Sequence, residues 1–456
     1  MNTKQYDAII IGSGQAGTPL AFSLAKNEQK VALIEKQHIG GTCLNVGCTP
    51  TKTYVASARR MWAVANSEDL GIEHNGNCRA NLDKIKTRKD KLIAKSVNGI
   101  KQSLQDNENI DHIVGTAIFT ANHEITVDGQ TYSADQIFIN VGARPFIPDE
   151  YKDIPYLTNE SILQLTEIPK HLIVIGGSYI GLEFGQMFKR FGSQVTILER
   201  SDRIINREDK DSSEVVLKFL KEEGIDFILD AKKINLEHTD GQVFIKVNDV
   251  HNLRGSHVLI AIGRKPNTDL LDLSKTDIDL NDKGYIQVDD HCRTSVSGVF
   301  AMGDCNGEGA FTHTAYNDYQ IVEDFIFGEK HRKISDRIMT YGLFVDPPLG
   351  RCGLTTQQAL DKGIKIKVGK RNMSKISRAK EKGETNGFMK ILVNADSDKI
   401  VGACVLGTGG DEIITSIMNI MYADQSYKLI RDSVVLHPTV SELIPTTLEK
   451  LNRIDE

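Results

Sequence analysis

One pattern of strand, glycine turn, helix and acidic residue occurs twice in this chain, and it constrains the fold more than any other feature. The first copy has a buried-strand pattern at Tyr6–Ile11 and the motif G-S-G-Q-A-G at residues 12–17. A helical stretch then runs to about Asn27, and a second strand pattern at Lys30–Ile34 ends at Glu35. A glycine turn between a parallel strand and a helix is typical of a dinucleotide-binding module.

The second copy repeats this order further along the chain. A strand pattern at His171–Ile175 leads into G-G-S-Y-I-G at residues 176–181, and a helical stretch runs to about Phe191. The next strand pattern, Gln194–Leu198, ends at Glu199. In both copies 23 residues separate the first glycine from the acidic residue.

The chemistry of a dinucleotide explains these residue types. Glycines permit a tight turn and let the backbone approach a pyrophosphate, and the N-terminus of the helix supplies N–H donors to that anion. The acidic residue accepts hydrogen bonds from ribose hydroxyls. A single glycine motif could be a plain turn, whereas two copies in register predict two nucleotide sites. The residues expected to hold the nucleotides on this ground are Gly12, Gly14, Gly17, Glu35, Gly176, Gly181 and Glu199.

Each copy also has a later apolar strand that contains a glycine, at Gln136–Ala143 and His257–Arg264. We interpret these as the returning strands of two doubly wound modules, one inserted in the other. After about residue 340 the glycine motif is absent. The predicted fold is therefore α/β, with two doubly wound modules and a C-terminal α+β domain. In that last domain we expect strands near Phe388–Val393 and Ile400–Leu406, and helices near Asp411–Ala423 and Val440–Leu451.

Composition excludes several classes of protein. The net charge of -6 is mild and has no basic block, which argues against a nucleic-acid partner. Apolar runs stay shorter than the roughly 18 residues of a membrane span, and the first strand leaves no room for a signal peptide. The seven cysteines are too few for a secreted disulfide scaffold. We therefore expect a soluble cytoplasmic protein with one special cysteine pair.

That pair lies in the segment G-G-T-C-L-N-V-G-C-T-P-T-K at residues 40–52. Cys43 and Cys48 stand five residues apart in a glycine-containing turn that opens a helix, a spacing that can close a small disulfide ring. The N-terminus of a helix favours the thiolate needed for exchange. Zinc ligation or two inert thiols are the alternatives, but zinc needs further ligands and only His38 is near. No metal site is expected.

This segment resembles the signature of the class I flavoprotein disulfide reductases, a family that includes glutathione reductase, dihydrolipoyl dehydrogenase and mercuric reductase. Two more segments resemble family signatures, T-S-V-S-G-V-F-A-M-G-D at 294–304 and H-P-T-x-x-E at 437–442. The resemblance implies FAD and either NADH or NADPH as cofactors. It also implies that Cys48 lies against the flavin as the thiolate, whereas Cys43 attacks the substrate.

The resemblance assigns further roles. It implies that Lys52 lies near the flavin ring with Glu183 as its partner, and that Asp304 accepts a hydrogen bond from the ribityl chain. It implies that His437, oriented by Glu442, serves as acid–base in the partner subunit's active site, so that the enzyme is a homodimer with shared active sites. Other residues expected at the cofactors are Gly41, Thr42, Lys52, Ala117, Gly142, Gly263 and Gly303.

The resemblance also gives domain limits. We expect an FAD-binding domain at 1–148 and 268–339, an inserted NAD(P)-binding domain at 149–267 and a dimerisation domain at 340–456. The choice between NADH and NADPH stays open. Glu199 would repel a 2′-phosphate, but Arg200, Arg203 and Arg207 could bind one, and Ser178 replaces the usual middle glycine.

The substrate is a small-molecule oxidant or a disulfide. No cysteine follows Cys404, which weakens mercury; Val435 stands where dihydrolipoyl dehydrogenases have His; Phe22 appears near the position of the peptide-binding Arg of glutathione reductases. The runs at 47–52 and 311–319 look more like flavoproteins that resist hypothiocyanous acid or reactive chlorine, our first choice.

Other activities stay open. They are a mercuric reductase-like, dihydrolipoyl dehydrogenase-like or glutathione reductase-like enzyme, a flavin-based redox sensor or metal-binding protein, and a flavin oxidase without thiol chemistry. The remaining cysteines are taken as structural: Cys78, Cys292, Cys305, Cys352 and Cys404.

Overall fold

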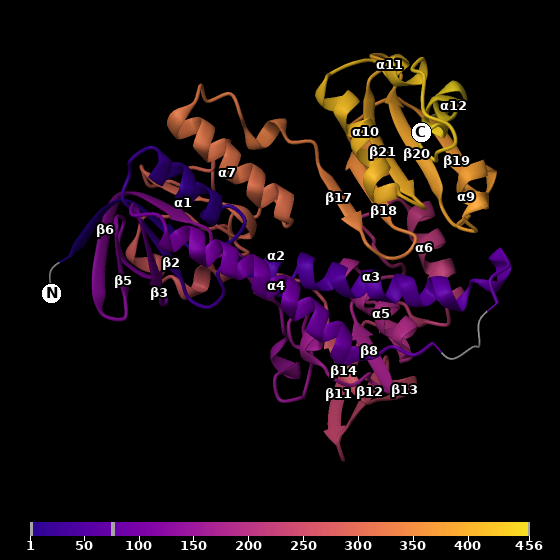
Figure 1. The fold of residues 1–456 in the computed structure, drawn as a ribbon, viewed down its shortest axis with the longest axis horizontal. Coiled ribbons are helices and arrows are strands. Elements are labelled where there is room, and N and C mark those ends of the chain that lie inside the picture. The colour runs from indigo at the N-terminus through magenta and orange to yellow at the C-terminus, as the bar shows by residue number, and fades with distance from the viewer. Residues whose placement is uncertain (1–2, 74–77, 455–456) are drawn as a thin grey trace. The chain divides into compact units, whose positions relative to one another are not determined.

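The computed structural model describes residues 3–73 and 78–454, which form two compact units. The first unit comprises residues up to 53, residues 86–146 and residues 263–337. The second comprises residues 54–85, 147–262 and those from 338 onward. Figure 1 shows the elements of both units, which are described one at a time.

The first unit is built on a mainly parallel sheet. Strands β1 (Lys4–Ile11) and β2 (Val31–Glu35) pair in parallel register, with Ala8 opposite Val31. The second half of β1 and most of β2 are buried apolar runs, as expected where both faces of a doubly wound sheet are covered. The sheet order is β3-β2-β1-β6-β5-β4, and β16 pairs with β6. The other strands are β3 (Ile110–Val114), β4 (Ile118–Ala121), β5 (Glu124–Val127), β6 (Gln130–Ile139) and β16 (Val299–Ala301).

The side chains of β1 alternate between two cores. Ala8 and Ile10 pack with the helices α1 (Gly17–Lys26) and α7 (Thr312–Phe327) on one face of the sheet. Ile9 and Ile11 pack on the other face with buried residues of β4, β5 and β6. The strand period of two therefore divides one apolar run between both layers. The remaining long helices are α3 (Cys48–Ala65) and α4 (Leu82–Gln105).

The second unit contains the second doubly wound module. Its parallel sheet has the order β10-β9-β8-β14, and the helices are α5 (Tyr179–Phe191) and α6 (Lys210–Glu222). A separate antiparallel sheet joins β11, β12 and β13. The strands are β8 (His171–Ile175), β9 (Gln194–Leu198), β10 (Asp226–Ile228), β11 (Ile234–Thr239), β12 (Gln242–Val247), β13 (His251–Gly255) and β14 (His257–Ile260).

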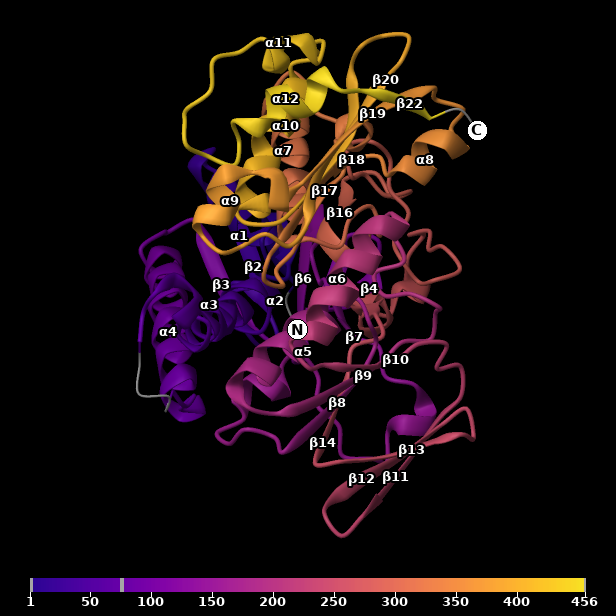
Figure 2. The same cartoon turned by 90° about the vertical axis from the view of Figure 1, so that its right-hand side faces the viewer.

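The C-terminal part of the second unit is an antiparallel sheet covered by helices (Figure 2). Residues of α10 and α12 pack on one face, whereas Ala359 of α8 (Thr356–Asp361) packs with Leu392 on the other. The strand order is β17-β18-β21-β20-β19-β22. The elements are β17 (Thr340–Leu343), β18 (Leu349–Gly353), β19 (Ile366–Asn372), β20 (Phe388–Asn394), β21 (Ile400–Leu406), β22 (Asn452–Ile454), α10 (Gly410–Tyr422), α11 (Lys428–Arg431) and α12 (Leu443–Glu449).

The predicted fold class is confirmed, and several elements begin and end where the sequence placed them. The returning strands are shorter than expected. The expected strand to Ala143 ends at Ile139, and the expected strand to Arg264 ends at Ile260. Each expected strand is interrupted before a second short strand, β7 (Ala143–Pro145) or β15 (Arg264–Pro266). Each interruption contains a glycine with positive φ, Gly142 at 65° and Gly263 at 140°.

One C-terminal helix is also shorter than predicted. The expected helix Val440–Leu451 is helical only over Leu443–Glu449. Its first residues form a tight turn instead, with Leu443 N–H bonded to Val440 O and Ile444 N–H bonded to Ser441 O. The expected domain limits stay predictions. The chain leaves the first compact unit after Phe146, returns at Gly263 and leaves again after Arg337.

Replacing Gly17 by Ala tests the packing of the first glycine turn. A Cβ at Gly17 would overlap the backbone oxygen of Gly12, so the turn must open. We expect Gly17→Ala to lower the free energy of unfolding by about 1–3 kcal/mol. The control is Gly99→Ala in α4, where a Cβ meets nothing within 4 Å and helix propensity improves. Thermal unfolding compares the two; equal midpoints would refute this description of the turn.

Candidate active site

The two cysteines of the motif lie side by side in the first unit. Cys43 is in the short helix α2 (Gly41–Asn45), and Cys48 is the first residue of α3. A Cβ at Gly47 would lie 2.8 Å from the Thr42 oxygen, so the reversal between the two cysteines requires glycine. Both are free thiols, Cys43 half-buried and Cys48 exposed, and their side chains are hydrogen-bonded to each other.

This contact decides which thiol keeps its proton. The hydrogen bond with Cys48, followed by burial and the charge of Cys48, raises the pKa of the Cys43 thiol. Cys43 therefore holds its proton more tightly than a free thiol does, and it needs help to lose that proton. A thiolate is the form that reacts in disulfide exchange.

A residue that the sequence analysis did not assign touches this pair. The Oγ1 atom of Thr312 lies 3.2 Å from the Cys48 Sγ atom, and its hydroxyl also lowers the pKa of Cys43. Thr312 opens α7, so the contact joins residues 264 positions apart. The only sequence signal that could have identified Thr312 is that it is a hydroxyl residue at the start of a helix that follows a strand of the same sheet.

The first glycine turn fits a pyrophosphate. A Cβ on Gly41 would lie 2.7 Å from the Gly14 Cα atom, so the cysteine segment approaches the turn as closely as backbone allows. The N–H of Gly17 donates to Asn140 Oδ1 at 2.8 Å, and the residue before the helix, Ala16, gives no side-chain cap. A helix N-terminus beside glycines is suited to bind phosphate.

Glu35 is fixed at the end of β2 by its own surroundings. Its Oε2 atom accepts hydrogen bonds from Ser13 N–H at 2.9 Å and from Ser13 Oγ at 2.8 Å. Its Oε1 atom accepts from the Gln37 N–H at 2.9 Å. The carboxylate is therefore oriented beside the glycine turn, where the dinucleotide-binding motif predicts a ribose.

A buried ion pair supports the Gly303–Asp304 turn after β16. The N–H of Gly303 donates to Asp318 Oδ2 at 2.7 Å, and Arg337 pairs with the other oxygen of Asp318. Burial raises the pKa of Asp304, although Arg264 stands 3.7 Å away and opposes the shift. A supported acidic turn at the end of a strand fits the hydroxyls of a flavin nucleotide, so the residues of the first unit fit FAD.

The other expected cofactor residues of the first unit occupy different parts of it. Lys52 lies one helical turn after Cys48 in α3, and Thr42 is in α2. Ala117 is buried immediately before β4, and Gly142 follows β6. The roles of these residues at the cofactor stay predictions.

The second glycine turn repeats the geometry of the first. Gly176 has a φ of 114°, and its Cβ would overlap the Ala261 oxygen. Glu199 Oε2 accepts the Gly177 N–H at 2.7 Å, and Oε1 accepts the Ser201 N–H at 2.8 Å. Glu35 and Glu199 are thus held in the same way, each by one backbone donor from its glycine turn and one from its own loop.

The three arginines after Glu199 differ in their surroundings. Arg203 donates from Nη2 to the Asn206 oxygen at 2.9 Å, so it is bonded within its own loop. Arg200 and Arg207 are exposed. Ser178 precedes α5 in an extended conformation, with a φ of −109°. Serine therefore occupies the middle position of the motif without backbone strain.

Two further predicted pairs involve the second unit. His437 Nδ1 lies 2.8 Å from Glu442 Oε2, and the side chain of His437 is 77% exposed. Glu183 is buried in α5, and its Oε1 atom accepts the Phe344 N–H at 2.9 Å. The structure therefore brings His437 and Glu442 together, whereas the partnership of Glu183 with Lys52 stays a prediction.

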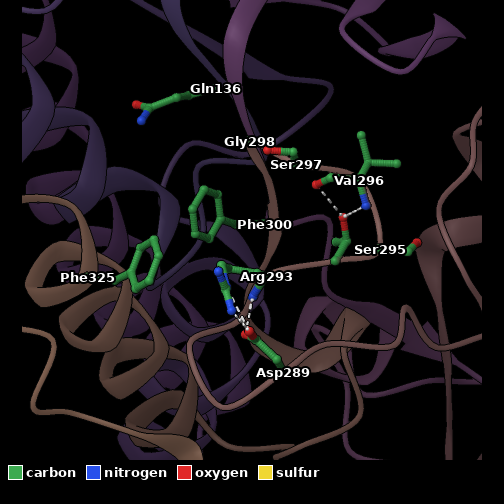
Figure 3. A pocket seen from close by; sticks show the side chains of 10 residues that line it. Gln136, Asp289, Arg293, Ser295, Val296, Ser297, Gly298, Phe300 and Phe325 are labelled. Carbon is green, nitrogen blue, oxygen red and sulfur yellow. Dashed lines mark hydrogen bonds and ion pairs between the residues drawn. The ribbon is translucent and has the colours of Figure 1, made fainter.

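A separate hollow of about 420 Å³ lies in the first unit (Figure 3). It adjoins Gly298 at the beginning of β16, whereas the Gly303–Asp304 turn follows the end of that strand. Its guanidinium, Arg293, is already bonded to Asp289 through Nε at 2.7 Å. No cysteine lines this hollow, so it is not the redox site.

The remaining cysteines lie apart from this chemistry. Burial raises the pKa of Cys305, Cys352 and Cys404 to about 12, and that of Cys292 well above its usual value. These four are neutral buried thiols, and Cys78 is exposed. Across residues 3–73 and 78–454, no helix is long and apolar enough to cross a membrane, and no cluster of three or more potential metal ligands occurs.

Comparison with known proteins gives full-length matches. Residues 6–318 match the family model described as pyridine nucleotide-disulphide oxidoreductase, and residues 339–448 match the dimerisation domain of that family. The chain is 36% identical to the probable pyridine nucleotide-disulfide oxidoreductase RclA of Escherichia coli (strain K12), covering 96% of this chain and 98% of the relative. It is 32% identical to a dihydrolipoyl dehydrogenase of Staphylococcus aureus, over 97% and 96% of the two chains.

A solved structure is equally similar along its length. It is described as the Cu(II) complex of the HOCl-induced flavoprotein disulfide reductase RclA from Escherichia coli. The TM-score is 0.89 at 34% identity, over 98% of this chain and 99% of the other.

Thr312→Val tests the shared hydroxyl. Its loss removes an interaction that lowers the pKa of Cys43, so alkylation of Cys43 by iodoacetamide should shift to higher pH. At fixed neutral pH we expect a rate about fivefold lower, the value of one hydrogen bond of ~1 kcal/mol. Mass spectrometry of the reduced protein measures alkylation at each cysteine. Thr312→Ser keeps the hydroxyl and should behave as wild type; an unchanged pH profile in Thr312→Val would contradict the assignment.

Proposed function

The chain belongs to the pyridine nucleotide-disulphide oxidoreductase family, and we propose that it reduces a small electrophilic oxidant of the hypothiocyanous-acid or reactive-chlorine type through Cys43 and Cys48. As a member of that family it is an oxidoreductase that uses FAD and NAD(P)H. The observation that carries the proposal is the hydrogen-bonded thiol pair with Thr312 at its side. The full-length similarity to an HOCl-induced reductase supports the choice of substrate.

Bound FAD supplies the transfer of an electron pair from NAD(P)H to the Cys43–Cys48 disulfide. The protein residues determine the thiol chemistry after that transfer. In this proposal Cys48 ionises before Cys43, so it is the thiolate that waits at the N-terminus of α3. Cys43 retains its proton until a base removes it, and it is then the thiolate that meets the oxidant. Within the first unit, the glycines of the 12–17 turn, Glu35 and Asp304 would hold FAD.

The reaction with hypothiocyanous acid is written with both steps balanced. The Cys43 thiolate attacks the oxidant's sulfur, a sulfur–sulfur bond forms, and the bond to hydroxyl breaks; the hydroxide takes a proton and leaves as water. The Cys48 thiolate then attacks the Cys43 sulfur and releases thiocyanate. Two thiols are oxidised to one disulfide, and the oxidant gains two electrons.

The base for Cys43 is His437, in this proposal, from the partner subunit of a homodimer. Its Nδ1 atom is hydrogen-bonded to Glu442, which favours the tautomer whose Nε2 atom carries the lone pair. The ring is largely exposed, so this lone pair faces outward and can accept a proton. The match of residues 339–448 to the family's dimerisation domain supports the assembly. Lys52 and Glu183 would stand at the flavin, as the resemblance implies.

We also propose NADH as the preferred coenzyme. Glu199 is held by Gly177 and Ser201 as Glu35 is held in the first module, and the adenosine of FAD carries an unphosphorylated ribose. A carboxylate fixed in this way accepts a 2′-hydroxyl and repels a 2′-phosphate. The bond from Arg203 to Asn206 keeps that cation within its own loop.

A substrate panel tests the proposal. The panel contains hypothiocyanous acid, hypochlorous acid, oxidised glutathione, lipoamide, Hg(II) and Cu(II), each followed by anaerobic loss of NADH and of NADPH. We expect the first two to be reduced fastest and Cys43→Ser to lose turnover with both. Activity that survives in Cys43→Ser would indicate flavin chemistry without thiols. Background rates with every acceptor would favour a sensor.

His437→Gln separates the base from the rest of the enzyme. We expect kcat/KM for the oxidant to fall about 10²- to 10⁴-fold, the contribution of a positioned acid–base group. Reduction of the enzyme by NADH should be unchanged, as measured by counting free thiols after one equivalent. His331→Gln is the control, because His331 is an exposed histidine beside Glu329. An unaltered kcat/KM in His437→Gln would exclude His437 as the base.

Glu199→Gln tests coenzyme choice. The substitution keeps a hydrogen-bond acceptor and removes the charge that repels a 2′-phosphate. We expect the ratio of kcat/KM for NADH over NADPH to fall about tenfold, or ~1.4 kcal/mol. Glu237→Gln, in β11 of the same module and exposed, should leave the ratio unchanged. A wild-type enzyme that already prefers NADPH would overturn the NADH proposal.

A further inference from the structure

The second unit contains a buried set of charged side chains that the dithiol chemistry does not use. We call it the Arg351 cluster, which consists of Tyr341, Arg351, Lys390, Glu208 and Asp209. The first three lie on strands of the C-terminal sheet, and the two carboxylates immediately precede α6. Ionised groups are rarely buried without a purpose, because each must be fully paired to offset its lost hydration.

Glu208 is the centre of the cluster. Arg351 donates to Glu208 from Nε at 3.1 Å and pairs with its other oxygen through Nη2. The hydroxyl of Tyr341 also donates to Glu208. Burial, and then the charge of Glu208, raise the pKa of Tyr341, so the phenol remains a donor. Three bonds from two strands of the C-terminal sheet thus fix one carboxylate of the nucleotide module.

Asp209 is held in the same way from the other side. Lys390 stands 2.7 Å from Asp209 Oδ2, and the Thr356 N–H donates to Oδ1 at 2.9 Å. Figure 2 shows α6, which begins after these two carboxylates, against the strands that supply their partners. Contacts from the C-terminal part of the unit therefore fix the beginning of α6.

The segment that Glu208 ends is strained. Ile205 has a φ of 40°, a left-handed conformation that branched side chains avoid. It is buried, its N–H donates to the Gly177 oxygen at 2.9 Å, and its oxygen accepts the Glu208 N–H at 2.8 Å. Such a conformation persists only where the surroundings impose it. Here Gly177 and Glu208 impose it from the two ends.

This strained segment reaches the second glycine turn. Gly177 gives its oxygen to Ile205 and its N–H to Glu199 Oε2 at 2.7 Å. The ring of Tyr179, at the start of α5, packs edge-on against Tyr341 with centroids 5.5 Å apart. The Arg351 cluster thus contacts the start of α5 directly, and it is linked to Gly177 and Glu199 through Ile205.

We propose that Arg351 and Tyr341 are positioning residues for NAD(P)H: through Glu208 they hold the loop of residues 199–209 so that Glu199 meets the adenosine ribose. The inference rests on the proposed function in one respect, the placement of the coenzyme at the second glycine turn. It adds that residues of the dimerisation domain determine the geometry of the coenzyme site without forming part of that site. Neither residue touches the coenzyme.

Tyr341→Phe is the test, because it removes the hydroxyl that bonds Glu208, together with that hydroxyl's bond to the Tyr179 side chain, and keeps the ring against Tyr179. Calorimetry of the FAD-loaded enzyme with ADP-ribose, which contains the adenosine half and cannot react, measures binding alone. We expect Kd to rise about five- to tenfold, the loss of one hydrogen bond to a charged group. KM for NADH should rise similarly with kcat unchanged, and the preference for NADH over NADPH should narrow.

Lys370→Gln is the matched control. Lys370 belongs to the same charged neighbourhood, 2.6 Å from Asp211, but it has no bond to Glu208 or Asp209 and is 39% exposed. We expect its Kd for ADP-ribose to equal that of wild type. Thermal midpoints of both variants show whether either loses stability, and Arg351→Lys supplies a second variant that keeps a cation at Glu208.

The outcomes separate this inference from the proposed function. Equal Kd values for wild type and Tyr341→Phe would refute the positioning role, as would an equal rise in Lys370→Gln. A wild-type enzyme that fails to bind ADP-ribose would instead refute the placement of the coenzyme, and the inference with it. A lower thermal midpoint with an unchanged Kd would show a purely structural cluster and also overturn it.

Discussion

The close approach of two backbone segments determines the geometry of the first unit. No side chain fits between Gly41 and Gly14, because a Cβ on the former would lie 2.7 Å from the Cα of the latter. This contact places the segment that carries Cys43 directly on the glycine turn at the N-terminus of α1. A redox pair that exchanges electrons with a bound dinucleotide has to lie this near the turn. The chemistry of both cysteines therefore depends on the packing of these two glycines.

The two modules solve the same physical problem in the same way, and a local rule explains why sequence could anticipate it. Glu35 and Glu199 each stand at the end of a buried strand, and each carboxylate accepts a backbone N–H from the glycine turn of its own module. Cys43 with Cys48 and His437 with Glu442 are also near in sequence, five residues apart, so a motif could pair them. Strand ends were less predictable, since Gly142 and Gly263 stop strands through backbone angles that apolar patterning does not reveal.

Contacts across the chain could not be anticipated. Thr312 meets Cys48 over 264 residues, and Arg351 meets Glu208 over 143. In the sequence, Thr312 is one hydroxyl residue in a short polar run. Arg351 lies in a strand whose sequence pattern does not mark it as special. Each is given its role by the return of a late element to an early one: α7 to the cysteine helix, and β18 to the beginning of α6. Local motifs thus predict which groups react, whereas tertiary packing decides which groups tune and hold them.

The electrostatic logic of the thiol pair links these levels. Because Cys48 raises the pKa of Cys43, the two thiols cannot both ionise readily. A sulfur that keeps its proton is protected from adventitious oxidation until a base arrives, and the hydroxyl of Thr312 moderates this effect at Cys43. The imidazole of His437 is oriented by Glu442 and is largely exposed. This arrangement suits a base that acts on a group outside its own loop. Under the proposed function, His437 takes the proton from Cys43 of the partner subunit, so in that proposal assembly is itself a condition of turnover.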